Sequence, residues 1–297
     1  MVVWPLVVSL LLAPQEQDMS AVQIETVKVA PGVAMLAGRG GNIGVCYGED
    51  GVVLIDDEYA PLTDKIKAAV GALSDKPIRF LLNTHWHFDH TGGNENLGKG
   101  GVVIVAHDNV RKRMSVEQFI EAMNLKVPAS PRLALPIVTF NDTVTFHMNG
   151  DDMLAFHVPP AHTDGDTVVR FQKANVVHMG DVLFNGSYPF VDLSSGGSVD
   201  GMIAAVNQVL GMIDAETKII PGHGPMADRT ALRSYRDMLV TARSRVEPLL
   251  AGGKTLEEVK AAQLTKDLDE VWGKGFVKGD RFVESVYKSL AQGKAKK

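Results

Sequence analysis

Three histidines and one aspartate lie within the six residues His85-Trp86-His87-Phe88-Asp89-His90. The apolar run Ile78–Leu82 precedes them and, bounded by Pro77 and Asn83, predicts a buried strand. The cluster is therefore expected in the loop at the end of a strand, where open α/β sheets place their sites. Imidazole nitrogens and carboxylate oxygens are ligands that suit Zn²⁺ and its neighbours. A solvated, histidine-rich loop is the structural alternative, but the spacing favours a metal site.

Similar side chains recur in three later segments, each directly after an apolar run. These segments are Ala161–Asp166 with His162, His178–Phe184 with Asp181, and Ile219–Gly224 with His223. The upstream run Val53–Ile55 ends in the same way, at Asp56. Each candidate ligand is therefore expected at the end of a predicted strand.

In this order, the four motifs resemble the HxHxDH signature and the later His, Asp and His motifs of the metallo-β-lactamase superfamily. The resemblance covers about residues 24 to 225. It implies an α/β fold, namely a four-layer αβ/βα sandwich with extra C-terminal helices. It also implies a dinuclear site with two Zn²⁺, although iron or manganese suits the same ligands. Carried over motif by motif, one zinc takes His85, His87 and His162, a second takes Asp89, His90 and His223, and Asp181 bridges both.

The resemblance further implies a metal-dependent hydrolase, in which a metal-bridging hydroxide attacks a carbonyl. Asp89, Asp181 and His223 are the residues expected to be catalytic. Supporting aspartates are expected to orient the ligand imidazoles through their other nitrogen; the candidates are Asp56, Asp164 and Asp166. The four histidines that are not candidate ligands are expected to be structural, namely His107, His147, His157 and His178.

The substrate is expected to be a small molecule, and opening of a cyclic amide by a β-lactamase is the leading hypothesis. Asp181 stands where some β-lactamases of the superfamily carry a zinc-binding Cys, and Phe184 stands where many place a Lys that anchors the substrate carboxylate. Candidate replacement anchors are Arg39, Ser187, Tyr188, Ser194 and Ser195. A lactonase and a thioester hydrolase resembling glyoxalase II are the enzyme alternatives. A metal-binding member without catalytic activity is the alternative from another class.

Composition excludes several other classes. The 297 residues are 45% hydrophobic and 22% charged, which is enough for a substantial core. A net charge of -5 and the absence of a basic stripe argue against a nucleic-acid partner. The single cysteine, Cys46, rules out an intrachain disulfide and a multi-cysteine zinc site, and is expected to be buried.

Hydrophobic periodicity gives the elements that must position these side chains. Short β-branched runs between residues 24 and 55 predict a meander of strands, with Gly38–Gly41 as a hairpin tip. The resemblance to β-lactamases of the superfamily implies that this tip covers the site. Helices are expected at Leu62–Leu73, Asp108–Met123 and Met202–Ile213. After His223 the pattern is helical, at Thr230–Leu250, Thr255–Ala262 and about Asp280–Gln292.

The first 18 residues are expected to form a leader. Val2–Ala13 is apolar, close to the length of the core of a signal peptide and too short to span a membrane. No Lys or Arg precedes this run, and Pro14 follows it. We expect a periplasmic or secreted protein, with a cytoplasmic location as the alternative. Residues 19–297 then form one hydrolase domain, of which about 228–297 is a helical extension; the oligomeric state is left open.

Overall fold

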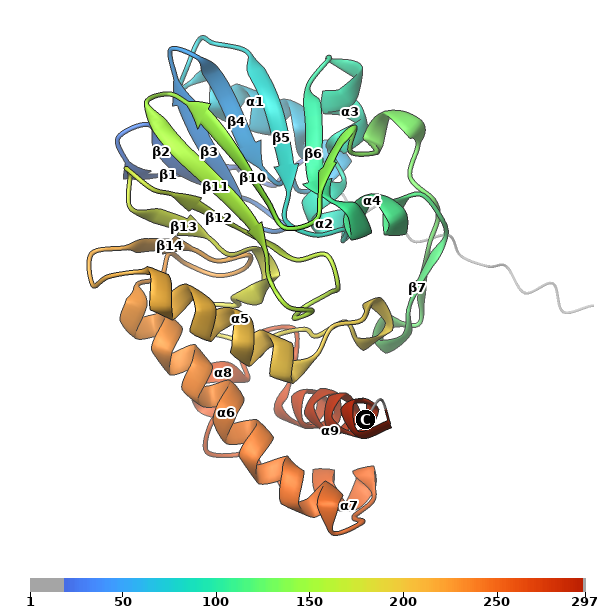
Figure 1. Cartoon of the computed structure of the whole chain (residues 1–297). Coiled ribbons are helices and arrows are strands. Elements are labelled where there is room, and N and C mark those ends of the chain that lie inside the picture. Colours follow the sequence, from blue (N-terminus) through green and yellow to red (C-terminus); the bar gives the residue numbers. More distant parts are fainter. Residues whose placement is uncertain (1–18, 296–297) are drawn as a thin grey trace, which may run out of the picture.

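Two β-sheets packed face to face form the centre of the computed structural model, which describes residues 19–295 (Figure 1). The predicted leader therefore lies outside the described residues. The first sheet has seven strands in the order β1-β2-β3-β4-β5-β6-β9, and β4, β5, β6 and β9 run parallel to one another. Its strands are β1 Glu25–Ala30, β2 Val33–Ala37, β3 Ile43–Gly48, β4 Gly51–Ile55, β5 Ile78–Asn83, β6 Val103–His107 and β9 Val138–Phe140.

The second sheet has five strands in the order β10-β11-β12-β13-β14. They are β10 Thr143–Met148, β11 Asp151–His157, β12 Thr167–Phe171, β13 Val176–His178 and β14 Lys218–Ile220. Neighbouring strands are antiparallel except β13 and β14, which are parallel. The carboxyl ends of β13 and β14 therefore lie at the same edge of this sheet.

Three apolar layers hold the sheets and helices together. The layer between the sheets joins Val53 and Leu82 of the first sheet to Val169 and Ile220 of the second, and it includes the buried Cys46 as expected. Alternation of side chains along each strand supplies these inward faces. The other two layers join the outer faces of the sheets to helices, so the molecule has the predicted four-layer sandwich.

Helices cover both outer faces of the sheet pair (Figure 1). On the first sheet, α1 Thr63–Gly71 packs through Ile66 and α3 Asn94–Lys99 packs through Leu97. The second sheet is covered by helices from the last part of the chain. These are α5 Val199–Met212, α6 Arg229–Ala251 and α9 Gly279–Ala295, with the short α7 Leu256–Ala261 and α8 Asp269–Trp272 between the last two. The predicted helices in this part of the chain are confirmed, while α8 was not predicted.

The helix predicted at Asp108–Met123 is wrong beyond its first half. Helix α4 covers only Asp108–Met114, and the strand β7 Gln118–Ile120 follows and pairs with β8 Leu125–Val127. The phenyl ring of Phe119 is largely exposed whereas Ile120 is buried, which is the alternation of a strand rather than a helical stripe. A left-handed residue, Asn124 with φ 48°, lets the chain reverse between the two strands. We call residues 118–127 the arm.

Within residues 19–295, no helix has both the length and the apolar character that a bilayer crossing requires.

Candidate metal centre

All seven predicted ligands meet at one edge of the two sheets. His85 and His87 follow β5, while Asp89 and His90 lie in the short helix α2 Phe88–Thr91 directly after them. The other three come from the second sheet: His162 from the β11–β12 loop, Asp181 from a 3₁₀ turn after β13, and His223 from the loop after β14. The expectation that every ligand lies at the end of a strand is confirmed, and both sheets contribute to the cluster.

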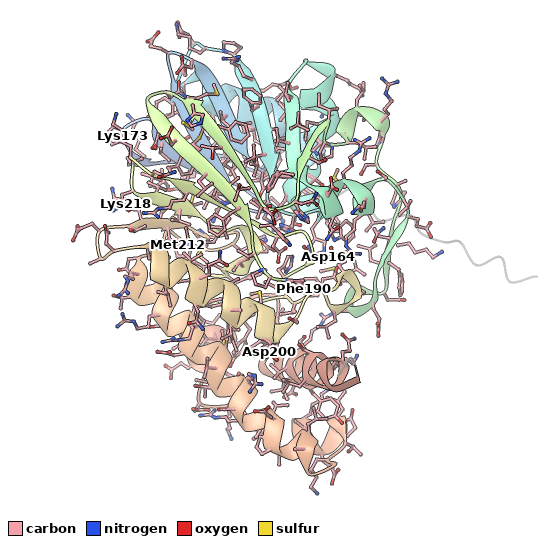
Figure 2. The ribbon with its side chains drawn as sticks, in the orientation of Figure 1. Asp164, Lys173, Phe190, Asp200, Met212 and Lys218 are labelled. Atoms are coloured by element: carbon pink, nitrogen blue, oxygen red, sulfur yellow. The ribbon has the colours of Figure 1, made fainter. Side chains whose placement is uncertain are left out.

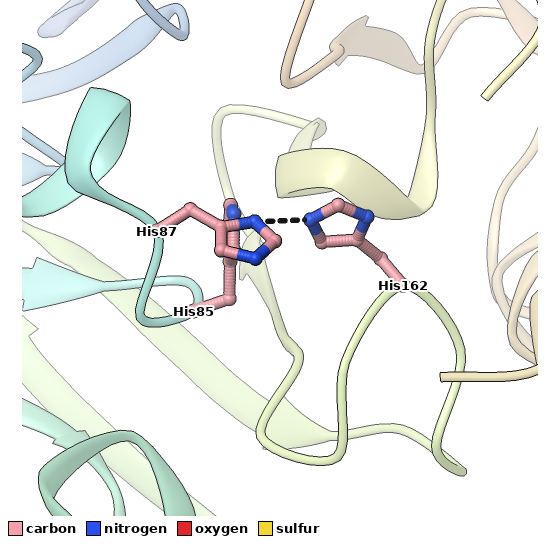
Figure 3. Close-up of side chains that lie close together, drawn as sticks. All are labelled: His85, His87 and His162. Carbon is pink, nitrogen blue, oxygen red and sulfur yellow. Dashed lines mark hydrogen bonds between the residues drawn. The ribbon is translucent and has the colours of Figure 1, made fainter. Parts of the chain in front are cut away.

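One half of the cluster consists of the imidazoles of His85, His87 and His162, all of them buried (Figure 3). The Nε2 atom of His162 lies 2.8 Å from Nδ1 of His87. Together with one ring nitrogen of His85, these atoms lie within 4.8 Å of one another. Three nitrogen ligands at this spacing are the set that catalytic zinc sites use, with a position left open.

The other half of the cluster contains Asp89, His90 and His223, again with ligand atoms within 4.8 Å of one another. Asp181 lies between the two halves. Its Oδ2 is 3.4 Å from Nε2 of His162, and its Oδ1 is 3.1 Å from Nε2 of His90. The carboxylate of Asp181 is therefore placed to contact cations on both sides.

In two ligand rings, a carboxylate lies beside the ring nitrogen that faces away from the cluster, and this contact determines which nitrogen carries the proton. Nε2 of His87 lies 3.0 Å from Oδ2 of Asp192, and Nδ1 of His90 lies 2.8 Å from Oδ2 of Asp56. A carboxylate can only accept, so each of these outer nitrogens donates its proton. In the neutral ring the other nitrogen then carries a lone pair that points into the cluster.

The same arrangement holds for two more rings, with neutral acceptors. Nδ1 of His162 donates to the carbonyl oxygen of Phe190 at 2.7 Å. Nδ1 of His85 lies 3.0 Å from Oγ1 of Thr84, whose own proton is donated to Asp56 at 2.7 Å, so this oxygen accepts from His85. In their neutral forms these four imidazoles therefore present lone pairs inward, which is the tautomer that metal ligation needs.

Unpaired polar atoms and shifted pKa values show that the part of the cluster around Asp181 and His223 favours added positive charge. Nε2 of His85 and Oδ1 of Asp181 are buried without a hydrogen bond, which is costly unless another partner satisfies them. Burial disfavours charge on Asp181, yet the imidazoles of His223 and His90 outweigh it and hold the pKa of this carboxyl well below its usual range. Conversely, burial opposes protonation of His223, but Asp181 overcomes it and raises the pKa of His223 to about 9. The donor set therefore fits divalent cations.

The supporting aspartates are only partly those that the sequence indicated. Asp56 holds His90 as expected, but Asp164 forms a bidentate ion pair with Arg113, with both oxygen–nitrogen distances 2.7 Å. Asp166 accepts from the backbone N–H of His162 at 2.6 Å and shapes the loop rather than orienting the ring. Asp192 was missed, because its contact with His87 spans 105 residues and nothing in its neighbourhood along the chain indicates it.

The cluster lies at the base of a cavity of about 580 Å³. Asp89, Asp181 and His223 reach this cavity, and Phe184 and Phe190 form part of its apolar wall. The ring of Phe184 stacks on that of His223, with 5.1 Å between ring centroids. A substrate in this cavity would therefore contact the ligand side chains directly.

Of the five predicted anchors, two line the cavity without a polar contact to any described residue that occupies their side-chain donors. Arg39 and Ser187 line it. The hydroxyl of Tyr188 donates to Asp269 at 2.8 Å, and Ser194 and Ser195 both donate to Asp192. These three hydroxyls already donate to carboxylates of the protein, which favours Arg39 and Ser187 as anchors; anchoring by any of the five stays a prediction.

The predicted hairpin tip at Gly38–Gly41 does lie against the cluster. Backbone N–H groups of Arg39 and Gly40 donate to Oε2 of Glu58, each at 3.1 Å. A side chain at Gly41 would lie 2.0 Å from the ring of His90, so only glycine allows this close approach. The tip is therefore fixed beside the second half of the cluster.

Comparison with known proteins agrees with this geometry. Residues 36–250 match the family model described as the metallo-beta-lactamase superfamily. A relative named "Probable metallo-hydrolase YqgX", from Bacillus subtilis, is 28% identical over 192 residues, which are 59% of this chain and 84% of that protein. A hydroxyacylglutathione hydrolase from Pelagibacter ubique is 28% identical over 163 residues, but the match spans only 57% of its length and 53% of this chain.

Among solved structures, a metallo-beta-lactamase from Pontibacter korlensis superposes with a TM-score of 0.61. The match covers 73% of this chain and 99% of that protein at 20% sequence identity, and it shows the shared fold. The family model covers most of the chain and includes all seven ligand positions. The chain therefore belongs to the metallo-β-lactamase superfamily and is a metal-dependent hydrolase.

Proposed function

We propose that this protein hydrolyses activated carbonyl compounds at a dinuclear metal centre, and that ring opening of a β-lactam is its reaction. The observation that carries the proposal is the cluster itself: five imidazoles and two carboxylates converge at the base of a cavity. Two zinc ions bound there would polarise the carbonyl and lower the pKa of water to about 7. His85, His87 and His162 would hold one ion, Asp89, His90 and His223 the other, and Asp181 both.

The side chains around the cluster prepare it for this reaction. Asp192 and Asp56 fix the rings of His87 and His90, so that the ligands need not reorganise during the reaction. Phe184 and Phe190 exclude water from one side of the cavity and thereby strengthen electrostatic interactions inside it. No serine or cysteine nucleophile is required.

A β-lactam carries a carboxylate beside the scissile amide, and Arg39 is placed to bind it. The guanidinium group makes no hydrogen bond or ion pair to any residue of the described chain, while the backbone below it is fixed by Glu58. A guanidinium group binds carboxylates through two parallel hydrogen bonds. Arg39 thus takes the role that a cation at the position of Phe184 would otherwise fill.

A thioester is the second candidate substrate, because the cavity is lined mainly by apolar side chains and a related chain is a hydroxyacylglutathione hydrolase. Attack on a thioester or a lactone uses the same arrangement of ligands. A neutral lactone has no carboxylate, so its hydrolysis would not depend on Arg39, whereas that of a β-lactam would.

The test is turnover of a chromogenic cephalosporin by zinc-loaded protein, with a chelated sample as the blank and a hydroxyacylglutathione thioester measured in parallel. We expect chelator-sensitive cephalosporin hydrolysis with kcat/KM of about 10⁴ M⁻¹s⁻¹, the low end for true substrates. Arg39→Met should raise KM for the cephalosporin with kcat retained. Rapid thioester cleavage with no cephalosporin turnover would move the assignment to the second candidate, and inactivity on both by protein with two zinc ions would refute the proposal.

A further inference from the structure

One wall of the cavity comes from a segment beyond the part of the chain that matches the family. Gly275–Val277, between α8 and α9, lines the cavity, whereas the family match ends at residue 250. The segment is held against the catalytic loops. Val277 forms an isolated antiparallel bridge with Tyr188, and a side chain at Gly275 would lie 2.6 Å from Cβ of Ser187. Its position in the cavity wall is therefore fixed by the fold.

The side chain of Phe276 is available to a ligand. It is 64% exposed, although it lies in a concave wall. Its ring meets that of Phe190 edge to face, with centroids 6.5 Å apart and an angle of 76°. The ring of Phe190 is in turn 6.0 Å from that of His87. The ring of Phe190 therefore contacts both the candidate ligand His87 and Phe276. In Figure 2, Phe190 lies between the strand ends and α9.

Another part of the wall is supplied by the arm, through Ile120 and Met123. Arg281 of α9 connects the two parts: its guanidinium carbon lies 5.3 Å from the centre of the Phe276 ring, and its Nη2 donates to the carbonyl oxygen of Ala122. The arm is also tied to the catalytic loops, because its Glu121 N–H donates to Oγ of Ser194 at 3.2 Å. The arm and Gly275–Val277 are therefore each tied to neighbouring segments, and both contribute apolar side chains to the cavity.

A largely exposed phenylalanine is unfavourable in water, and burying it against an apolar group removes that cost. Val271 of α8 shows the contrast: it is 57% exposed but does not line the cavity. The exposed ring of Phe276 lies in a concave surface together with other apolar side chains, including Phe190, Ile120 and Met123, and beside the candidate metal centre. These features together are those of a ligand-binding site.

We propose that Phe276, Phe190 and Met123 form the binding site for an apolar group of the substrate, aromatic or aliphatic, and that Phe276 determines specificity for it. The proposal rests on the hydrolase function and adds the substrate class. The substrate carries an apolar group at one end, the scissile carbonyl above the cluster, and an anionic group that Arg39 binds at the other end.

Binding of two dyes to zinc-loaded protein tests this independently of turnover. The anionic dye 8-anilinonaphthalene-1-sulfonate and the neutral N-phenyl-1-naphthylamine share their rings and differ in the sulfonate. We expect Phe276→Ala to weaken both dyes at least fivefold, and Phe276→Leu to retain most of the affinity because it restores an apolar side chain. Arg39→Met should weaken only the anionic dye. Val271→Ala is the matched control and should change neither.

Unchanged binding of both dyes in Phe276→Ala, with a zinc content equal to the wild type, would overturn the proposal. Equal weakening by Val271→Ala would also overturn it, because the dyes would then report general apolar surface. The outcome is separable from that of the proposed function. If Phe276→Ala weakens dye binding but the wild type hydrolyses neither test substrate, the binding site is supported and the proposed function is refuted. If the wild type is active but turnover and dye binding do not depend on Phe276, the proposed function is supported and the binding site is refuted.

Discussion

The metal cluster and the apolar wall of the same cavity are built in different ways. The cluster comes from the ends of strands in two packed sheets, and its imidazoles are oriented by partners such as Asp56 and Asp192. Part of the wall, including Phe184 and Phe190, comes from the loop after β13, but other parts come from the arm and from Gly275–Val277, which lie outside both sheets. The difference indicates that the sheets position the metal ligands, and under our proposal the peripheral segments select the substrate.

The largest effect on activity is expected for Asp181→Ala, which removes the carboxylate between the two halves of the metal cluster. We expect kcat/KM to fall at least 30-fold, about 2 kcal/mol of transition-state stabilisation, because a buried electrostatic group is lost. Steady-state kinetics on the best substrate measures it. A change of the wall such as Phe276→Ala should instead act mainly through KM. Near-native turnover of Asp181→Ala would contradict the dinuclear mechanism.

A pair of glycines tests how closely the hairpin tip must approach the cluster. In Gly41→Ala the added carbon would lie 2.0 Å from the His90 ring, so the tip or the ring must move. We expect a loss of unfolding free energy of about 1–3 kcal/mol together with weaker zinc binding. Gly211→Ala in α5 has nothing within 4 Å and should stabilise by about 0.5–1 kcal/mol. Chemical denaturation measures both, and equal effects would show that the tip has no special role.

The supporting carboxylate gives a smaller effect. Asp192→Asn keeps the shape of the side chain but removes the charge that faces His87, so zinc affinity should fall about tenfold. Asp200→Asn, at an exposed ion pair with Arg243, is the control. Titration against a competing chelator gives both affinities. Indistinguishable affinities would mean that Asp192 does not act through His87.

The smallest expected effect is a dependence of the free energy of unfolding on pH. It arises from His107, which belongs neither to the metal cluster nor to the cavity wall. His107 is buried and its ring stacks on His157 with centroids 3.9 Å apart; its Nδ1 accepts from the Asn109 N–H. Burial and the neighbouring His157 lower the pKa of His107 to about 4. The unfolded chain, with a pKa of about 6.5, binds the proton first. Stability is therefore full above pH 6.5 and falls toward pH 4, by about 1 kcal/mol after solvent screening.

His107→Asn should remove this loss, because an asparagine can still accept from the Asn109 N–H but does not titrate. Thermal unfolding of both proteins between pH 4 and pH 7 makes the comparison. If the two profiles have the same slope over this range, the acid sensitivity comes from other groups.

Much of the fold and of the cluster could be predicted because the information is local. Val53–Ile55 and Ile78–Leu82 are apolar runs that stop at ligand or supporting residues, and β-strands end where such runs end. The contributions of Asp192 and Phe276 could not be predicted, since each depends on contacts between distant parts of the chain. The arm was mistaken for helix because Phe119 and Met123 also fit a helical spacing.

The number of zinc ions that the purified chain binds tests the central claim most directly. Dialysis against dilute zinc followed by elemental analysis should give two ions per chain for the wild type. His85→Ala and His223→Ala, which remove one ligand from each half, should each give fewer. Less than one ion per wild-type chain would contradict the account, because the four oriented imidazoles would then not serve as metal ligands.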